Sequence, residues 1–176
     1  MNFSFKHLDS DTRKLMLDEL TMDSTADRLY LGKYLNGDGE RAWPDLLRKA
    51  ISSGDEVSLA NDILPQQFWL ATYQRRTPSG GYTQARVPQT APTTLAEGEF
   101  VRFYLRGVCR VAIVDSRSVR VVRMKAVADP RPESQAAIGR AVDPNALLAD
   151  LRQNIGIDTF LGIPAGPNSG IGVELA

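Results

Sequence analysis

The stretch that decides the fold is TLAEGEFVRFYLRGVCRVAIVDSRSVRVVRMK, residues 94–125. Its first part predicts one long helix, because apolar side chains recur at helical spacing between residues 100 and 112. Thr94 and Glu97 have the spacing of a capping box, which would start this helix. Beyond the helix the period changes, and the valine-rich run 118–127 predicts a strand. We therefore expect a helix followed by a strand at the centre of the fold.

Four short helices are predicted before this stretch, at residues 9–22, 24–35, 44–54 and 55–64. The sequence gives each a local start or stop signal: Asp9 or Ser10 caps the first, Ser24 or Thr25 caps the second, Pro44 lies in the first turn of the third, and Gly54 ends it. The run Asn36-Gly37-Asp38-Gly39 predicts a break between the second helix and the third. Together these helices indicate a compact helical subdomain.

A β-hairpin is predicted next, from two aromatic and β-branched segments at residues 68–75 and 82–87. They flank the glycine-rich tip Thr77-Pro78-Ser79-Gly80-Gly81, and Arg75, Arg76 and Arg86 lie close to this tip. These arginines are candidate partner contacts, and a solvated turn is the alternative interpretation. Residues 88–94 then predict an extended linker.

The C-terminal region predicts a helix that starts at Asp143-Pro144 and an extended arm over residues 157–176. Glycine and proline exclude a helix in the arm, while Ile163, Ile171 and Val173 make it too apolar for a disordered tail. Such an arm would dock on its own domain or on a neighbouring subunit.

The fold class that follows is α+β. The chain divides into a helical subdomain (1–64), a hairpin with its linker (65–93), a helix–strand–helix core (94–156) and the C-terminal arm (157–176). Because the chain has 176 residues, we expect these parts to form one compact domain.

The formal net charge is zero, which argues against a general nucleic-acid or membrane binder. Residues 1–62 hold 12 acidic and 8 basic residues, whereas residues 63–176 hold 9 acidic and 13 basic residues. The two parts therefore carry −4 and +4. Head-to-tail contact between copies and pairing within one molecule would both fit this asymmetry. With no signal peptide and no membrane span in sequence, a chain made or assembled in the cytoplasm is expected.

Arg102, Arg106 and Arg110 follow one another at one-turn spacing, so they form a row on the long helix. Three interpretations are open: a solvated face paired with acids of the N-terminal helices, a subunit contact, and a phosphate or nucleic-acid surface. Gly107 lies in the same helix, where glycine costs about 1 kcal/mol relative to alanine. Close approach of another backbone would explain it, and a small kink is the alternative.

Residues with catalytic or metal-binding potential are few. Cys109 is the only cysteine and His7 the only histidine, so neither a disulfide nor a common zinc site is possible. Cys109 has the surroundings of a small buried side chain. Asp115, Asp129 and Glu133 would suit a metal-dependent nuclease only with an acidic-x-lysine spacing that is missing. We expect no catalytic residue, no metal and no cofactor.

The segments LLRKAISSGDEVSLANDI (46–63) and EFVRFYLRGVCRVAI (99–113), with the proline- and glycine-rich ending, resemble small virion proteins of tailed bacteriophages. The resemblance covers most of the chain but carries over no functional residue. It implies a structural or assembly role in a phage particle, with a virion location.

The function expected is therefore that of a repeated structural protein, whose partners are itself or other particle proteins. The arms at 1–8 and 157–176 would lie on neighbouring subunits, and the basic hairpin and the arginine row would meet acidic partners. The alternative is a nucleic-acid-associated regulator or metal-dependent nuclease that uses Arg102, Arg106 and Arg110.

Overall fold

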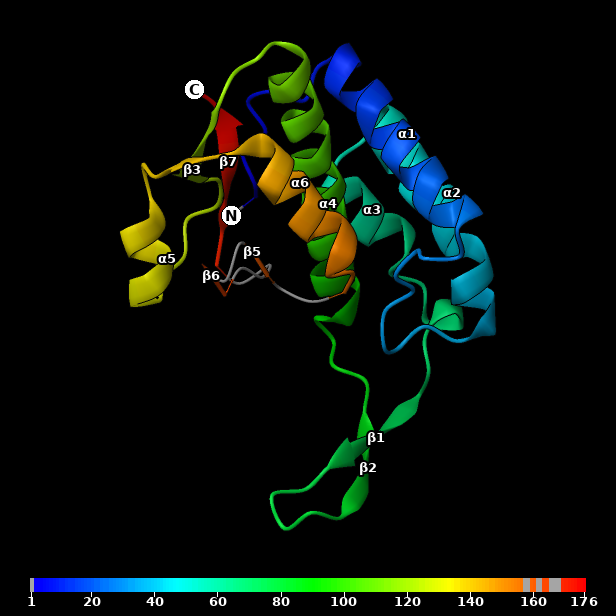
Figure 1. The fold of residues 1–176 in the computed structure, drawn as a ribbon. Helices are drawn as coiled ribbons and strands as arrows, with labels where there is room; N and C mark the ends of the chain where they lie inside the picture. The colour runs from blue at the N-terminus through cyan, green and yellow to red at the C-terminus, as the bar shows by residue number, and fades with distance from the viewer. Residues whose placement is uncertain (1, 157–158, 161–162, 165–168) are drawn as a thin grey trace.

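Helix α4 (Ala91–Val114) forms the centre of the molecule, as Figure 1 shows in a computed structural model. The structure describes residues 2–156, 159–160, 163–164 and 169–176. Helices α1 (Ser10–Thr25), α3 (Glu56–Asp62) and α6 (Pro144–Gln153) pack along α4. A small antiparallel sheet lies beside α4. The predicted α+β class, with a long central helix followed by a strand, is confirmed.

The start of α4 differs from the prediction. The helix begins at Ala91, with Pro92 in its first turn, where the missing amide hydrogen is not needed. Thr90 is the N-cap residue and makes no capping hydrogen bond with its side chain. The amide of Thr94 donates to the carbonyl of Thr90 inside the helix. The capping box of Thr94 and Glu97 is therefore wrong, and the predicted linker already belongs partly to the helix.

Gly107 lies where α1 crosses α4. A Cβ atom at this position would lie 2.8 Å from the Met16 side chain and 3.1 Å from the Thr12 carbonyl oxygen. The close backbone approach predicted for this glycine is confirmed, because any larger residue would push α1 away.

The N-terminal helices number three where the sequence predicted four. Helix α1 is capped by Asp9, whose carboxylate accepts from the Thr12 amide at 2.9 Å. Helix α2 (Gly37–Ser53) is capped by the Asn36 side chain. Helix α3 is closed by a capping box that starts at Asp55.

The helix predicted at 24–35 is absent. Asp27 and Gly32 adopt left-handed backbone conformations, with φ of 52° and 76°, which a helix cannot contain. The carbonyl of Tyr30 instead accepts a hydrogen bond from the Trp43 indole at 2.9 Å. The predicted break at residues 36–39 is in fact the start of α2, and Pro44 lies well inside that helix. Tertiary contacts thus replace local helix formation here.

The sheet has the strand order β4-β3-β7, with both pairings antiparallel. The central strand β3 (Val119–Arg123) is shorter than the predicted run, while β4 (Ala141–Val142) and β7 (Ile171–Leu175) flank it. Val121 pairs with Val173, both are buried in the core, and β7 contacts α4. Four further short elements are the 3-10 turn η1 (Gln66–Phe68), helix α5 (Pro132–Ala137) and the paired strands β5 (Thr159–Phe160) and β6 (Ile163–Pro164).

Both ends of the chain fold back onto their own domain (Figure 1). The Phe3 amide donates to Glu56 at 3.0 Å and the Ser4 amide to the Met124 carbonyl at 2.8 Å. Strand β7 completes the sheet, with Ile171 and Val173 in the core. The arms at 1–8 and 157–176 were predicted to lie on neighbouring subunits. The structure contradicts this prediction, because the apolar side chains of Phe3, Ile171 and Val173 fill the molecule's own core. The rest of the C-terminal arm, residues 157–158, 161–162 and 165–168, lies outside the described residues.

The β-hairpin forms as predicted and projects from the body of the molecule (Figure 1). Strands β1 (Thr72–Arg76) and β2 (Tyr82–Arg86) pair in register from Thr72–Arg86 to Arg76–Tyr82. Within the described residues, no helix combines the length and the apolar character needed to cross a bilayer.

Candidate functional site

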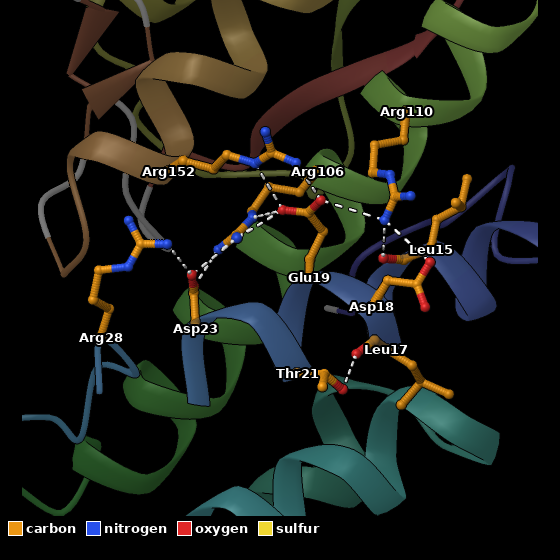
Figure 2. Close-up of polar contacts among 10 residues, drawn as sticks. All are labelled: Leu15, Leu17, Asp18, Glu19, Thr21, Asp23, Arg28, Arg106, Arg110 and Arg152. Atoms are coloured by element: carbon orange, nitrogen blue, oxygen red, sulfur yellow. Dashed lines mark hydrogen bonds and ion pairs between the residues drawn. The ribbon is translucent and has the colours of Figure 1, made fainter. Parts of the chain in front are cut away.

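Helices α1, α4 and α6 are joined by a buried network of charged side chains, drawn in Figure 2. The guanidinium of Arg106 is completely buried. Its Nε donates to Glu19 Oε2 at 2.8 Å, and its Nη2 donates to Asp23 Oδ1 at 3.1 Å. Arg152 of α6 also binds both oxygens of Glu19, at 2.6 and 3.0 Å.

Glu19 is charged in this network despite its burial. Burial alone would raise the pKa of Glu19, but the hydrogen bonds and charges of Arg152 and Arg106 outweigh it and lower the pKa. Arg110 sits at the edge, 3.2 Å from Asp18, with its side chain 27% exposed. The network therefore neutralises buried carboxylates of the acidic N-terminal part with arginines from residues 63–176.

The arginine row has a structural role and offers little surface. Arg106 and Arg110 pair with acids of α1, as the first interpretation predicted, but the face is not solvated, because Arg102 and Arg106 are buried. Arg102 pairs instead with Glu99 of its own helix at 3.1 Å and donates to the Asn154 carbonyl at 2.7 Å. Arg102 and Arg106 are buried, so they cannot form the predicted contacts with a protein or nucleic-acid partner.

Cys109 is buried on the face of α4 that contacts the core. Burial raises the pKa of its thiol to about 12, so the thiol is protonated at neutral pH. Among the described residues, no three or more His, Cys, Asp or Glu side chains are grouped so that they could hold a metal ion.

The projecting hairpin is the most exposed part of the predicted site. Residues directly opposite each other in an antiparallel pair share one face of the ribbon. One face carries six exposed side chains, and its members are Thr72, Gln74, Arg76, Tyr82, Gln84 and Arg86. We call it the polar face of the hairpin. Arg75 is exposed on the opposite face.

The charge of the hairpin is one-sided. Residues 71–90 contain three arginines and no acidic residue. Within the part of the chain that the structure describes, Arg75, Arg76 and Arg86 form no ion pair, in contrast to the arginines of α4. Tyr82, which the sequence interpretation overlooked, is 70% exposed beside Arg76. The alternation of side chains along the two strands is the signal by which the polar face could have been found.

The root of the hairpin is fixed to the body. The Leu70 amide donates to the Tyr34 carbonyl at 2.9 Å, and Leu35 forms a β-bridge with Trp69. The ring of Tyr34 packs edge-on against that of Tyr73, with ring centroids 4.7 Å apart. The hairpin therefore leaves the body in a defined direction, while its polar face remains in solvent.

A cavity of about 330 Å³ lies at this root. Its walls come from the loop at residues 30–34, the hairpin root at Trp69 and Pro88, and the first two turns of α4. Glu99 and Arg102 also line it. Burial raises the pKa of Glu99, and the neighbouring Arg102 opposes this shift. Sequence reasoning missed this cavity, because its lining comes from segments far apart in the chain.

The remaining predicted contact residues lie in the C-terminal arm. Ile171 and Val173 are buried in β7, so they belong to the core and not to a partner surface. The backbone of Ile163 lies in β6, but its side chain is outside the described part of the structure. Of the nine predicted contact residues, the three hairpin arginines are the ones that the structure places fully in solvent. Comparison of the chain with family models, with curated proteins and with solved structures gave no significant match.

Proposed function

We propose that the protein is a repeated structural component of a phage-like particle, and that its hairpin docks on a neighbouring copy. The observation that carries this proposal is the exposure of the whole polar face of the hairpin, together with Arg75 on the opposite face. A two-stranded sheet without a packed layer is marginal in water. A partner that covers one face would supply the missing packing.

The side chains of the hairpin suit a protein interface. Arginine and tyrosine are enriched among the residues that contribute most to binding, and Arg76 and Tyr82 lie side by side on the polar face. A second copy offers opposite charge, since Asp38, Glu40 and Asp45 are exposed on the first half of α2 with Arg41 as the only base there. The resemblance to small virion proteins agrees with such an assembly role.

The test is the size of the protein in solution, measured by sedimentation at several protein and salt concentrations. We expect complexes larger than the 19.4 kDa chain at low salt, and their dissociation as salt screens the charged contacts. The variant R75E/R76E/R86E should sediment as a monomer. The matched control R48E/R120E/R140E reverses three exposed arginines outside the hairpin and should assemble like the wild type.

A strict monomer at low salt and high concentration would refute the docking of copies through the hairpin. So would equal loss of assembly in both triple variants, because net charge alone would then explain the result.

A second candidate function is nucleic-acid binding, favoured by the same polar face. A two-stranded ribbon fits the major groove of DNA, where arginine pairs with guanine and glutamine with adenine. Arg76, Arg86, Gln74 and Gln84 supply these side chains, and no carboxylate opposes the phosphates. A monomer whose affinity for duplex DNA falls steeply with salt, and is lost in R75E/R76E/R86E, would support this candidate.

A further inference from the structure

Two glycines inside α4 differ in what surrounds them. Gly107 is required by packing, because a Cβ atom there would meet α1. A Cβ atom at Gly98 would have no heavy atom within 4 Å, so the fold itself does not need a glycine at this position. Glycine inside a helix costs about 1 kcal/mol relative to alanine. What Gly98 does is line the cavity at the hairpin root, which a side chain would enter.

The cavity wall on α4 is one row of the helix. The row consists of residues at four-residue spacing, which therefore share one face of the helix: Thr94, Gly98 and Arg102. Gly98 has no side chain, so it leaves a space between the side chains of the other two. Three aromatic residues, Tyr30, Tyr34 and Trp69, also line the cavity. A volume of about 330 Å³ lies within the range of small-molecule sites. A lining that combines a glycine with three aromatic residues suits an aromatic ligand.

The charged residues around the cavity indicate the charge of the ligand that would bind there. Glu99 and Arg102 pair at 3.1 Å and neutralise each other. Lys33 is exposed on the lining, and within the described residues it forms no ion pair. The positive end of α4 opens on the same side, which adds to the effect of Lys33. Among the lining residues that the structure describes, the uncompensated charge is therefore positive.

We propose that this cavity is a binding site for a small aromatic molecule with one anionic group. The aromatic part fills the space beside Gly98 and contacts Tyr30 and Tyr34, and the anionic group faces Lys33. This site is separate from the polar face of the hairpin, and it does not depend on the role proposed for that face.

The experiment uses 2-naphthoate as the probe and the full chain as the protein. Binding is followed by titration calorimetry and by the amide NMR signals of Gly32 and Gly98, both of which line the cavity. We expect saturable one-to-one binding and shifts of these two signals. The cation 2-naphthylmethylammonium has the same ring system with opposite charge, and it should bind at least about tenfold more weakly.

Gly98→Leu places a side chain in the cavity, on a Cβ position that has no heavy atom within 4 Å, and should weaken naphthoate binding at least about tenfold. The matched control is Thr93→Leu, which adds the same side chain to an exposed position of the same helix outside the cavity. Thermal unfolding checks that both variants are folded. Lys33→Glu is a second variant at an exposed residue. It should weaken the binding of the naphthoate anion and strengthen the binding of the naphthylmethylammonium cation.

The proposal is overturned if naphthoate does not saturate up to its solubility, or if Gly98→Leu and Thr93→Leu bind it equally. Equal or tighter binding of the cation to the wild type would overturn the anionic class of the ligand.

Discussion

Replacing Arg106 with methionine tests whether the buried charge network holds the helices together. Methionine keeps much of the side-chain volume but leaves Glu19 and Asp23 buried without this arginine. Glu19 keeps Arg152, whereas Asp23 keeps only a 3.5 Å contact with the half-exposed Arg28. Removing one partner of a buried ion pair costs about 3–5 kcal/mol, and the retained Arg152 places the expected loss near the lower limit, about 3 kcal/mol.

The assay is urea unfolding followed by circular dichroism, with thermal unfolding as a second measurement. A loss of about 3 kcal/mol should lower the midpoint temperature by roughly 6–12 °C in a domain of this size. Arg110→Met is the matched control: its side chain is 27% exposed and pairs with the exposed Asp18, and after loss of its 3.4 Å contact with Glu19 that carboxylate still keeps Arg106 and Arg152. Exposed ion pairs contribute little, so this variant should lose less than about 1 kcal/mol.

A second substitution makes the test stricter, because it should change the stability in opposite directions in the two backgrounds. Asp23→Asn should destabilise the wild type, because it weakens the pair with Arg106. In the Arg106→Met background the same change should stabilise the protein, because it removes a buried charge that has lost its main partner. If the losses in Arg106→Met and Arg110→Met are equal, or if Asp23→Asn destabilises both backgrounds alike, the reasoning is refuted.

Three further predictions concern single residues. Gly107→Ala should destabilise the protein by about 1–3 kcal/mol, because the new methyl group overpacks against α1. Gly98→Ala should instead stabilise it by about 1 kcal/mol, because alanine is the better helix former and has room there. Urea unfolding of the two variants measures both changes in the free energy of unfolding. The thiol of Cys109 should react with a disulfide reagent only as fast as the protein unfolds, since burial raises its pKa to about 12; a rapid reaction of the folded protein would contradict this. The folded-state pKa of Glu19 is lowered, so its contribution to stability is complete above its ordinary value of 4.5 and is lost as the pH falls below it. Glu19→Gln should therefore be less stable than the wild type at neutral pH and should lose less stability below about pH 5, as acid unfolding curves of the two would show.

Local signals in the sequence located most of the elements. Asp9, Asp55 and the pair Asp143-Pro144 cap helices where the sequence predicted them. The glycine-rich tip after Arg76 forms the turn of the hairpin. These signals succeed because a cap or a tight turn is a hydrogen-bonding arrangement of residues only two to four positions apart.

Where the local sequence signals and the tertiary packing favoured different structures, the chain adopts the structure that the packing favours. Residues 24–35 have helical spacing of apolar side chains, but the indole of Trp43 donates to the Tyr30 carbonyl, and the chain is irregular after α1 ends at Thr25. Helix α4 starts at Ala91, ahead of the apparent capping box, and buries Ala91 and Pro92. A few tenths of a kcal/mol of local preference is small beside the burial of such side chains.

The candidate site was only partly predictable. The three hairpin arginines were identified from the sequence, because a polar turn between two strands is normally exposed. The row from Arg102 to Arg110 has the same composition, yet it is largely buried, because acids of α1 and the chain near α6 surround it. Exposure depends on what packs on a residue from elsewhere, and spacing along the chain does not contain that information.

The amino-acid sequence by itself determined an α+β chain, the long helix with its following strand, the helix starts at Asp9, Asp55 and Asp143, and the basic hairpin. Only the tertiary structure decided that Arg106 is buried, that β7 pairs with β3 of its own molecule and that a cavity opens over Gly98. The physical reason is range: caps, turns and periodicity act over one or two turns of chain. Ion pairs such as Arg106–Asp23 and Arg152–Glu19 join residues 83 and 133 positions apart, so they form only when the whole fold brings their helices together.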